Sequence, residues 1–252
     1  MPRARKKTNG NGTNGMTAKQ MKRKKPIDQS YMTDITPLTD NQKIAFDAYK
    51  EGKNLLLHGA AGTGKTFITL YLALQEVLDV KTPYDKIVIV RSLVPTREIG
   101  FLPGDHEDKS YLYQIPYKNM VRYMFSMPDD NSFQMLYDNL RAQETIDFWS
   151  TSFIRGVTLD SAIVIVDEFS NLNFHELDSM ITRIGEDSKI MFCGDITQTD
   201  LTREKDTSGI SDFIKIVENM KDIFSCVEFN INDIVRSGLV RSYLISKYNL
   251  GF

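Results

Sequence analysis

The sequence contains few cysteines and no long apolar run, and both absences restrict what the protein can be. Only two of its 252 residues are cysteines, Cys193 and Cys226, which are too few and too isolated for a disulfide framework or a zinc site. We expect both thiols to be reduced core residues, as in cytosolic proteins. No run of eighteen apolar residues occurs, so no membrane-spanning helix is predicted. The basic N-terminus lacks a following apolar segment, so we expect no secretory signal and a cytoplasmic location.

Acidic residues are missing from the first 26 positions, although the whole chain has a net charge of only −2. Nine of the 31 basic residues lie there, which leaves 22 basic against 33 acidic residues in the remainder. A stretch of Thr, Asn and Gly separates two basic clusters, and such a composition cannot pack a core. We therefore expect a disordered basic arm over residues 1–34 and a single domain over residues 35–252. The arm could contact a nucleic-acid backbone or simply aid solubility, and both interpretations remain open.

The most informative stretch is a glycine-rich turn between an apolar run and a helical pattern. Residues 55–57 are three consecutive leucines, which is typical of a parallel strand buried on both faces. A turn of this kind curls the backbone so that N–H groups hold phosphates at a positive helix terminus. A lysine then neutralises phosphate charge, and a threonine hydroxyl ligates Mg²⁺. We therefore predict a nucleoside triphosphate site, rather than a plain turn, at Gly59, Ala60, Ala61, Gly62, Thr63, Gly64, Lys65 and Thr66.

A later apolar strand ends in two carboxylates, in the stretch Ser-Ala-Ile-Val-Ile-Val-Asp-Glu over residues 161–168. We expect Asp167, at the strand tip, to hold the Mg²⁺ shell through water, and Glu168 to polarise an attacking water molecule. Adenylate-binding kinases and GTPases generally lack the second carboxylate. The pair therefore favours ATP hydrolysis, whereas a small-molecule kinase would have no use for Glu168.

Five further polar residues are candidates for the same site. Gln42 falls early in a predicted helix and can offer one donor and one acceptor to an adenine edge. Gln198 follows another predicted strand and could sense the γ-phosphate or orient the lytic water. A helix is predicted over residues 233–248, in which Arg236 is the candidate charge-stabilising arginine and Arg241 is its competitor. Arg91, at the end of a strand predicted over residues 86–91, could contact a phosphate or form an ion pair; we favour the phosphate.

Aromatic and basic residues are interleaved between the two motifs. We expect a long functional loop over residues 94–109, followed by helices over residues 111–125 and 133–140. Tyrosines near Lys118 and Arg122 suit stacking on single-stranded nucleic acid and neutralisation of its charge. For any single tyrosine, however, a place in the helix core is the preferred interpretation. The tyrosines are Tyr111, Tyr113, Tyr117, Tyr123 and Tyr137.

Taken together, these motifs resemble the PhoH family of P-loop ATPases over residues 38–248, in particular its short bacteriophage-encoded forms. Its members resemble the N-terminal motor core of superfamily 1 helicases. The resemblance implies an α/β P-loop NTPase fold, a three-layer sandwich with a mostly parallel central sheet and a RecA-like, superfamily 1 helicase-like core. The matching pieces are Asn41-Gln-Lys, Gly59-Ala-Ala-Gly-Thr-Gly-Lys-Thr, Gly100-Phe-Leu-Pro-Gly, Ile154-Arg-Gly-Val-Thr-Leu, Val166-Asp-Glu, Gly194-Asp-Ile-Thr-Gln-Thr-Asp-Leu and Asp233-Ile-Val-Arg.

The resemblance also implies an activity and partners. It implies ATP and Mg²⁺ as ligands, single-stranded nucleic acid as polymer with RNA favoured over DNA, and a homo-oligomer for which a hexameric ring is favoured. It places Gln42 at adenine, Gln198 at the γ-phosphate and Arg236 as the arginine finger. If a phage encodes the chain, the expected location is the cytosol of the host.

The sequence departs from the family pattern at one motif. Phe169 and Ser170 replace the usual Ala and Gln after the acidic pair, which removes a nucleotide-sensing Gln. We also find no second motor domain, so we do not expect a monomer to unwind a duplex. We therefore predict a nucleic-acid-dependent, helicase-like ATPase that acts as an oligomer. The alternative is an ATP-dependent regulatory switch in the phosphate-stress response, without unwinding activity.

Overall fold

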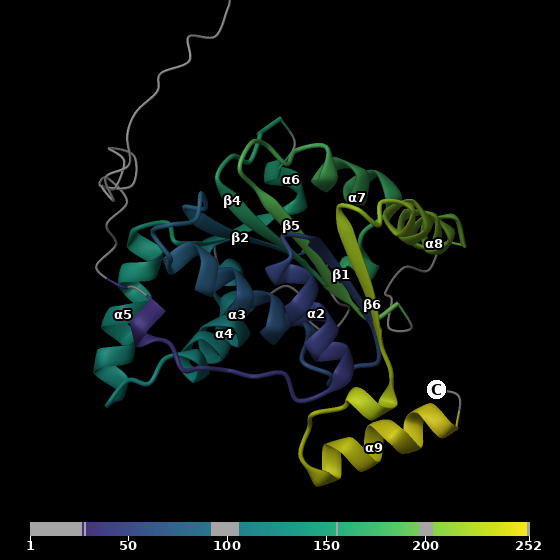
Figure 1. The fold of residues 1–252 in the computed structure, drawn as a ribbon, viewed down its shortest axis with the longest axis horizontal. Helices are drawn as coiled ribbons and strands as arrows, with labels where there is room; N and C mark the ends of the chain where they lie inside the picture. Colours follow the sequence, from purple (N-terminus) through teal and green to yellow (C-terminus); the bar gives the residue numbers. More distant parts are fainter. Residues whose placement is uncertain (1–26, 28, 92–105, 155, 197–203, 251–252) are drawn as a thin grey trace, which may run out of the picture.

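Six parallel strands form one sheet at the centre of the structure, with helices on both of its faces (Figure 1). The computed structural model describes residues 27, 29–91, 106–154, 156–196 and 204–250. The strand order is β3-β2-β4-β5-β1-β6, and the predicted three-layer α/β architecture with a parallel sheet is confirmed. The strands are β1 (Asn54–Gly59), β2 (Lys86–Arg91), β3 (Ile146–Ser150), β4 (Ala162–Asp167), β5 (Lys189–Gly194) and β6 (Phe224–Phe229).

The alternation of side chains along each strand divides the core into two layers. On β1, Leu55 and Leu57 pack in one layer and Leu56 in the other. The first layer is covered by α2 (Asp40–Lys50), α3 (Lys65–Leu78), α4 (His106–Met124) and α5 (Asp130–Ala142). The second is covered by α6 (Thr151–Ile154), α7 (Phe174–Ile181) and α8 (Glu204–Asn219). Because both faces are covered, the four interior strands β2, β4, β5 and β1 are almost continuously apolar, as expected of a parallel sheet.

Helix α9 (Gly238–Asn249) lies apart from these layers, beyond the carboxyl end of β6 (Figure 1). None of its residues is buried. The sequence predicted a helix over residues 233–248, but the structure has a 3-10 turn, η3 (Ile231–Asp233), before it. Asp233 accepts hydrogen bonds from the backbone N–H of Asn230 and from the side chain of Asn41. These bonds hold the turn in place, so the helix begins five residues later than expected.

Other element boundaries also differ from the sequence-based expectations. The predicted loop over residues 94–109 is partly wrong, because α4 already begins at His106; residues 92–105 lie outside the described part of the chain. Strand β3 and helices α7 and α8 were not predicted. The remaining short elements are η1 (Gln29–Tyr31) and η2 (Phe169–Asn171). The predicted arm lies mainly within residues 1–26, which are also outside the described residues.

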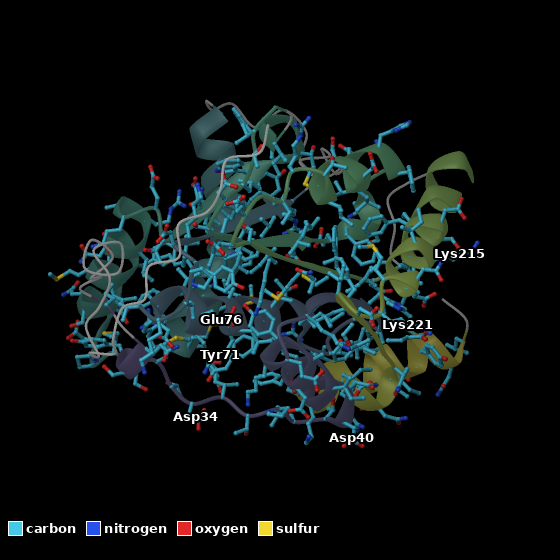
Figure 2. The ribbon with its side chains drawn as sticks, turned by 45° about the horizontal axis from the view of Figure 1, so that its top comes forward. Asp34, Asp40, Tyr71, Glu76, Lys215 and Lys221 are labelled. Carbon is cyan, nitrogen blue, oxygen red and sulfur yellow. The ribbon has the colours of Figure 1, made fainter. Side chains whose placement is uncertain are left out.

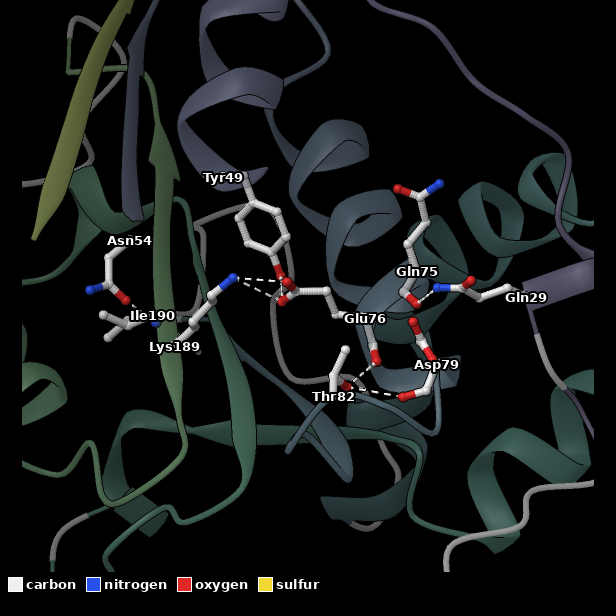
Figure 3. Close-up of polar contacts among 9 residues, drawn as sticks. All are labelled: Gln29, Tyr49, Asn54, Gln75, Glu76, Asp79, Thr82, Lys189 and Ile190. Carbon is white, nitrogen blue, oxygen red and sulfur yellow. Dashed lines mark hydrogen bonds and ion pairs between the residues drawn. The ribbon is translucent and has the colours of Figure 1, made fainter. Parts of the chain in front are cut away.

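A largely buried polar cluster joins α2 and α3 to the amino end of β5 (Figure 3). It lies at the opposite end of the sheet from the glycine-rich loop of residues 59–66, which we call the phosphate loop. The Lys189 ammonium donates to both carboxylate oxygens of Glu76, at 2.9 and 3.0 Å. The Tyr49 hydroxyl donates to the same carboxylate at 2.7 Å, and the Lys189 Nζ lies 4.0 Å from the centre of the Tyr49 ring. Each charge therefore has a partner, as a buried ion pair requires.

Other charged side chains lie on the outside of the molecule, among them Asp34, Asp40, Lys215 and Lys221 (Figure 2). Both cysteines are free thiols; Cys193 is buried as expected, and Cys226 is partly buried. In the described residues, no helix combines the length and the apolar character that crossing a membrane requires.

Candidate functional site

The glycine-rich turn joins the carboxyl end of β1 to the first turn of α3. Gly59 has a φ of +107°, and a Cβ atom at this position would lie 2.1 Å from the carbonyl oxygen of Phe229. Only glycine fits, because it has no side chain and tolerates a positive φ. The backbone N–H of Ala60 donates to the same Phe229 oxygen at 2.8 Å. The end of β6 therefore fixes the course of the loop.

The ammonium group of Lys65 lies within the curve of the loop. It donates to the carbonyl oxygens of Gly59 and Ala60, at 2.8 and 2.7 Å. Burial lowers the pKa of Lys65. The nearby acidic groups Asp195, Cys193 and Asp167 act in the opposite direction. This cation lies at the N-terminus of the fourteen-residue helix α3, where free N–H groups also favour an anion. The loop can therefore hold phosphate groups.

Thr66 brings the phosphate loop into contact with the acidic strand end. Its hydroxyl donates to Oδ1 of Asp167 at 2.8 Å, although the two residues are 101 positions apart. The strand order explains the contact, because only β5 separates β1 from β4. From β5, the thiol of Cys193 lies between them and donates to the same Oδ1 at 3.2 Å. The two sequence motifs therefore form one site.

The oxygen donors of this site fit a magnesium ion. Mg²⁺ is typically held by one or two carboxylates together with substrate phosphates and water. Thr66 and Asp167 supply a hydroxyl and a carboxylate, and burial raises the pKa of the Cys193 thiol, so that it stays protonated. No group of three or more His, Cys, Asp or Glu residues that could hold a metal occurs among the residues that the structure describes. Phosphate groups and water would supply the other ligands of an ion bound here.

Tyr117 is a member of the site that sequence reasoning did not identify. Its hydroxyl donates to Oδ2 of Asp167 at 2.5 Å, and only 2% of its surface is exposed. Burial, followed by the charge of Asp167, raises the pKa of Tyr117 well above its usual range, so the phenol remains a donor. No sequence signal marked it out from the other tyrosines of the region. Tyr117 and Tyr137 are both buried, as the core interpretation held, whereas Tyr123 is 75% exposed.

Glu168 is held by an arginine from the neighbouring strand. Arg91, the last residue of β2, donates to both of its carboxylate oxygens, at 3.1 and 2.5 Å. Of the two roles weighed for Arg91, the structure shows the ion pair, and the favoured phosphate contact stays a prediction. Glu168 has a φ of +51°, which is uncommon for a residue with a side chain and often occurs at functional sites.

Gln42 and the segment before α9 lie against the phosphate loop. The Gln42 carboxamide accepts from the N–H of Leu38 at 2.7 Å and donates to the carbonyl of Thr63 at 3.0 Å. The N–H of Val235 donates to the carbonyl of Gly62 at 3.1 Å. These bonds connect the loop to α2 and to the segment before α9. The predicted contact of Gln42 with adenine stays a prediction.

Of the remaining candidates, the structure describes Arg236 but not Gln198. A Cβ atom on Gly62 would lie 3.0 Å from Cγ of Arg236, so the stem of this exposed arginine passes directly over the loop. The role of Arg241 as its competitor stays a prediction. Gln198 lies outside the described residues, and its predicted role stays a prediction.

The two residues that depart from the family pattern are part of the core. Phe169 is fully buried, and its ring packs against those of Phe192 and Phe213. Ser170 is also buried. The backbone just beyond the acidic pair is thus anchored by an aromatic cluster that includes Phe213 of α8.

Comparison with known proteins identifies the family. The family described as "PhoH-like protein" matches residues 34–248. This chain belongs to the PhoH family. Among its relatives, a PhoH-like protein from Synechocystis is 35% identical over 184 residues, covering 73% of this chain and 53% of that protein. Protein PhoH2 from Bacillus subtilis is 32% identical over 177 residues, covering 69% of this chain and 39% of that protein. Protein PhoH from Escherichia coli is 33% identical over 197 residues, with coverages of 77% and 53%.

This PhoH-family chain thus spans about half the length, or less, of these curated relatives. The relatives named here are bacterial, and a bacteriophage origin stays a prediction. Among solved structures, Pif1 from Bacteroides, bound to single-stranded DNA, has a TM-score of 0.35 at 16% identity, covering 86% of this chain and 49% of that one. Pif1 helicase from Candida albicans has a TM-score of 0.37 at 13% identity, with coverages of 78% and 40%. We draw no functional conclusion from this degree of likeness.

Proposed function

We propose that this PhoH-family chain binds ATP with Mg²⁺ and hydrolyses it, and that it acts as a nucleic-acid-dependent, helicase-like motor. The observation that carries the proposal is the contact between the Thr66 hydroxyl and the Asp167 carboxylate. It joins a loop suited to phosphates to a carboxylate suited to a magnesium shell, and a second carboxylate, that of Glu168, follows directly. An ion bound here would neutralise charge on the phosphates during the reaction.

The other residues have complementary roles in this proposal. Lys65 neutralises phosphate charge from within the loop, and Glu168 accepts a proton from the attacking water. Gln198 senses the γ-phosphate, and Arg236 stabilises the charge that develops on it. The position of the Arg236 stem over Gly62 supports a contact with the nucleotide of its own chain.

Single-stranded nucleic acid is the proposed polymer, with RNA favoured. The basic residues in positions 1–26 support this proposal, because lysine and arginine bind phosphate backbones in a salt-dependent manner. The test is ATP turnover measured with and without single-stranded RNA and DNA, with Lys65→Ala as the inactive control. We expect RNA to raise the rate, and a rate unchanged by either polymer would count against the motor. Deleting residues 1–26 should weaken RNA binding at low salt and leave polymer-free turnover unchanged.

An oligomer, with a hexameric ring favoured, is also part of the proposal, and the cytoplasm is its proposed location. Helix α9 supports assembly, because it buries none of its own residues and exposes the apolar side chains of Leu239, Tyr243 and Tyr248. Exposed apolar patches commonly mark interfaces. Light scattering coupled to size-exclusion chromatography, with and without a non-hydrolysable ATP analogue, measures the assembly directly. A monomer under both conditions would contradict this part of the proposal.

A regulatory ATP switch without unwinding activity is the second candidate. The observation in its favour is the ion pair that occupies both carboxylate oxygens of Glu168, because a paired base would make hydrolysis slow. Under this alternative, turnover is slow and insensitive to polymer, and the nucleotide state changes the affinity for a protein partner. The turnover measurements described above separate the two candidates.

A further inference from the structure

The two carboxylate oxygens of Asp167 have different partners. Oδ1 accepts from the Thr66 hydroxyl at 2.8 Å and from the Cys193 thiol at 3.2 Å. Oδ2 accepts from the Tyr117 hydroxyl at 2.5 Å. Asp167 and Tyr117 are 5% and 2% exposed. Thr66 and Cys193 are near the phosphate loop, whereas Tyr117 reaches the carboxylate from α4.

The ring of Tyr117 is itself held in place. It packs edge-on against Phe148 of the edge strand β3, with 5.3 Å between the ring centres. A hydroxyl on a fixed ring can hold a carboxylate in one rotamer, because a charge-assisted O–H···O⁻ bond is both short and directional. Residues that hold a metal ligand from behind commonly determine how well the metal binds. A residue of α4 therefore fixes the orientation of the Asp167 carboxylate. The described residues of this helix include none of the motifs recognised in the sequence.

We propose that Tyr117 is a positioning residue for the magnesium site: its hydroxyl fixes Oδ2 of Asp167, so that Oδ1 faces Thr66 and the ion. This inference rests on the proposed function, since it assumes that Asp167 serves a nucleotide-bound magnesium ion. Tyr117 does not touch the ion or the nucleotide. It acts through Asp167, and its loss should change the dependence on Mg²⁺ more than the binding of the nucleotide itself.

The test is a Mg²⁺ titration of the binding of a fluorescent ATP analogue, N-methylanthraniloyl-ATP, to the full-length chain. In Tyr117→Phe, which keeps the ring and removes only the hydroxyl, we expect the Mg²⁺ concentration for half-maximal binding to rise about tenfold, as is typical when a support of a metal ligand is lost. Binding of the analogue in excess EDTA should not change. Turnover at saturating Mg²⁺ should recover most of the wild-type rate.

Tyr49→Phe is the matched control. It also removes a buried tyrosine hydroxyl that donates to a carboxylate, here Glu76 at 2.7 Å, but at the opposite end of the sheet. We expect it to lower the melting temperature and to leave the Mg²⁺ titration unchanged. A second comparison uses Asp167→Asn: in that background, adding Tyr117→Phe should have no further effect on the Mg²⁺ dependence, because the residue through which Tyr117 acts has already been changed.

The outcomes separate this inference from the proposed function. If the wild-type chain binds the analogue with no dependence on Mg²⁺, the proposed function fails. If the wild type depends on Mg²⁺ and Tyr117→Phe titrates within twofold of it, only the role of Tyr117 is wrong. Equal shifts in Tyr117→Phe and Tyr49→Phe would also overturn it, since the effect would then be a general loss of stability. A further shift in the Asp167→Asn background would exclude an action through Asp167.

Discussion

Arg91 and Glu168 form a bidentate ion pair at the carboxyl edge of the sheet, with the N–O distances of 3.1 and 2.5 Å given above. The pair follows from the strand order. Strands β2 and β4 are neighbours, and their register sets Arg91 beside Asp167, the residue before Glu168. While the guanidinium bonds both oxygens, two charge-assisted hydrogen bonds hold the carboxylate in one orientation. The proposed base is thus restrained in the structure described here.

The first prediction concerns this restraint. Arg91→Ala should raise ATP turnover in the absence of polymer by about fivefold, because a partly exposed ion pair contributes up to about 1 kcal/mol. Turnover is measured by phosphate release under saturating Mg²⁺ and ATP. The matched control is Arg141→Ala, which breaks the similarly exposed pair with Asp147 on β3 and should leave the rate unchanged. A rate at or below that of the wild type would mean that Arg91 positions Glu168 rather than restrains it.

A second prediction separates nucleotide binding from hydrolysis. Glu168→Gln keeps the shape of the side chain and removes its basicity, so ATP should still bind while turnover falls at least about 100-fold, a typical contribution of a general base. Lys65→Ala should instead abolish binding, because it removes the cation within the loop. Binding of the fluorescent analogue and phosphate release are measured on the same preparations. Normal hydrolysis by Glu168→Gln would exclude this residue as the base.

Local patterns in the sequence predicted much of the fold, and tertiary contacts explain where they failed. The apolar run 55–57 and the strand 86–91 were recognised because parallel strands are buried on both faces. Strand β3 has only five residues, and four of them, including Asp147, are only partly buried. It therefore lacks the continuous apolar pattern of an interior strand. The unpredicted turn before α9 depends on Asp233, whose partner Asn41 is 192 residues away.

The same distinction applies to the candidate site. The phosphate loop and the acidic pair are contiguous motifs, and their spacing alone indicated what each could bind. The role of Tyr117 depends on a partner 50 residues away and on which face of α4 meets the sheet, which no local pattern specifies. The ion pair of Arg91 with Glu168 likewise depends on strand order. Sequence reasoning could name an ion pair as one possibility for Arg91 but could not identify its partner.

A third prediction tests the close approach of the loop to β6. In Gly59→Ala, the new methyl group would lie 2.1 Å from the carbonyl oxygen of Phe229, at a φ of +107°. We expect the free energy of unfolding to fall by more than about 3 kcal/mol, since both steric overlap and backbone strain oppose the change. Gly52→Ala is the control: its φ is +89°, but no atom lies within 4 Å of the new methyl group. It should cost only about 1–2 kcal/mol. Equal losses in urea denaturation would show that the contact with Phe229 does not matter.

The last prediction concerns the pH dependence of stability and arises from His58, next to the loop on β1. This side chain is buried, and its Nδ1 has no hydrogen-bond partner among the described residues. Burial lowers the pKa of His58, and the charge of Lys65 acts in the same direction, while Glu228, Glu218 and Asp195 oppose the shift. In the unfolded chain, histidine has a pKa of about 6.5. Between the lowered folded value and about 6.5, the unfolded chain binds more protons, so the free energy of unfolding must rise with pH in that window.

The wild-type chain should therefore lose stability as the pH falls below about 6.5, and His58→Asn, which cannot titrate there, should lose less. The measurement is urea denaturation at several pH values from about 7.5 to 5.5. The control is His175→Asn, which changes an exposed histidine and should follow the wild type. Because other groups titrate in both chains alike, the difference between wild type and His58→Asn isolates this one side chain. A difference that stays constant across the range would mean that His58 is not kept neutral by its burial.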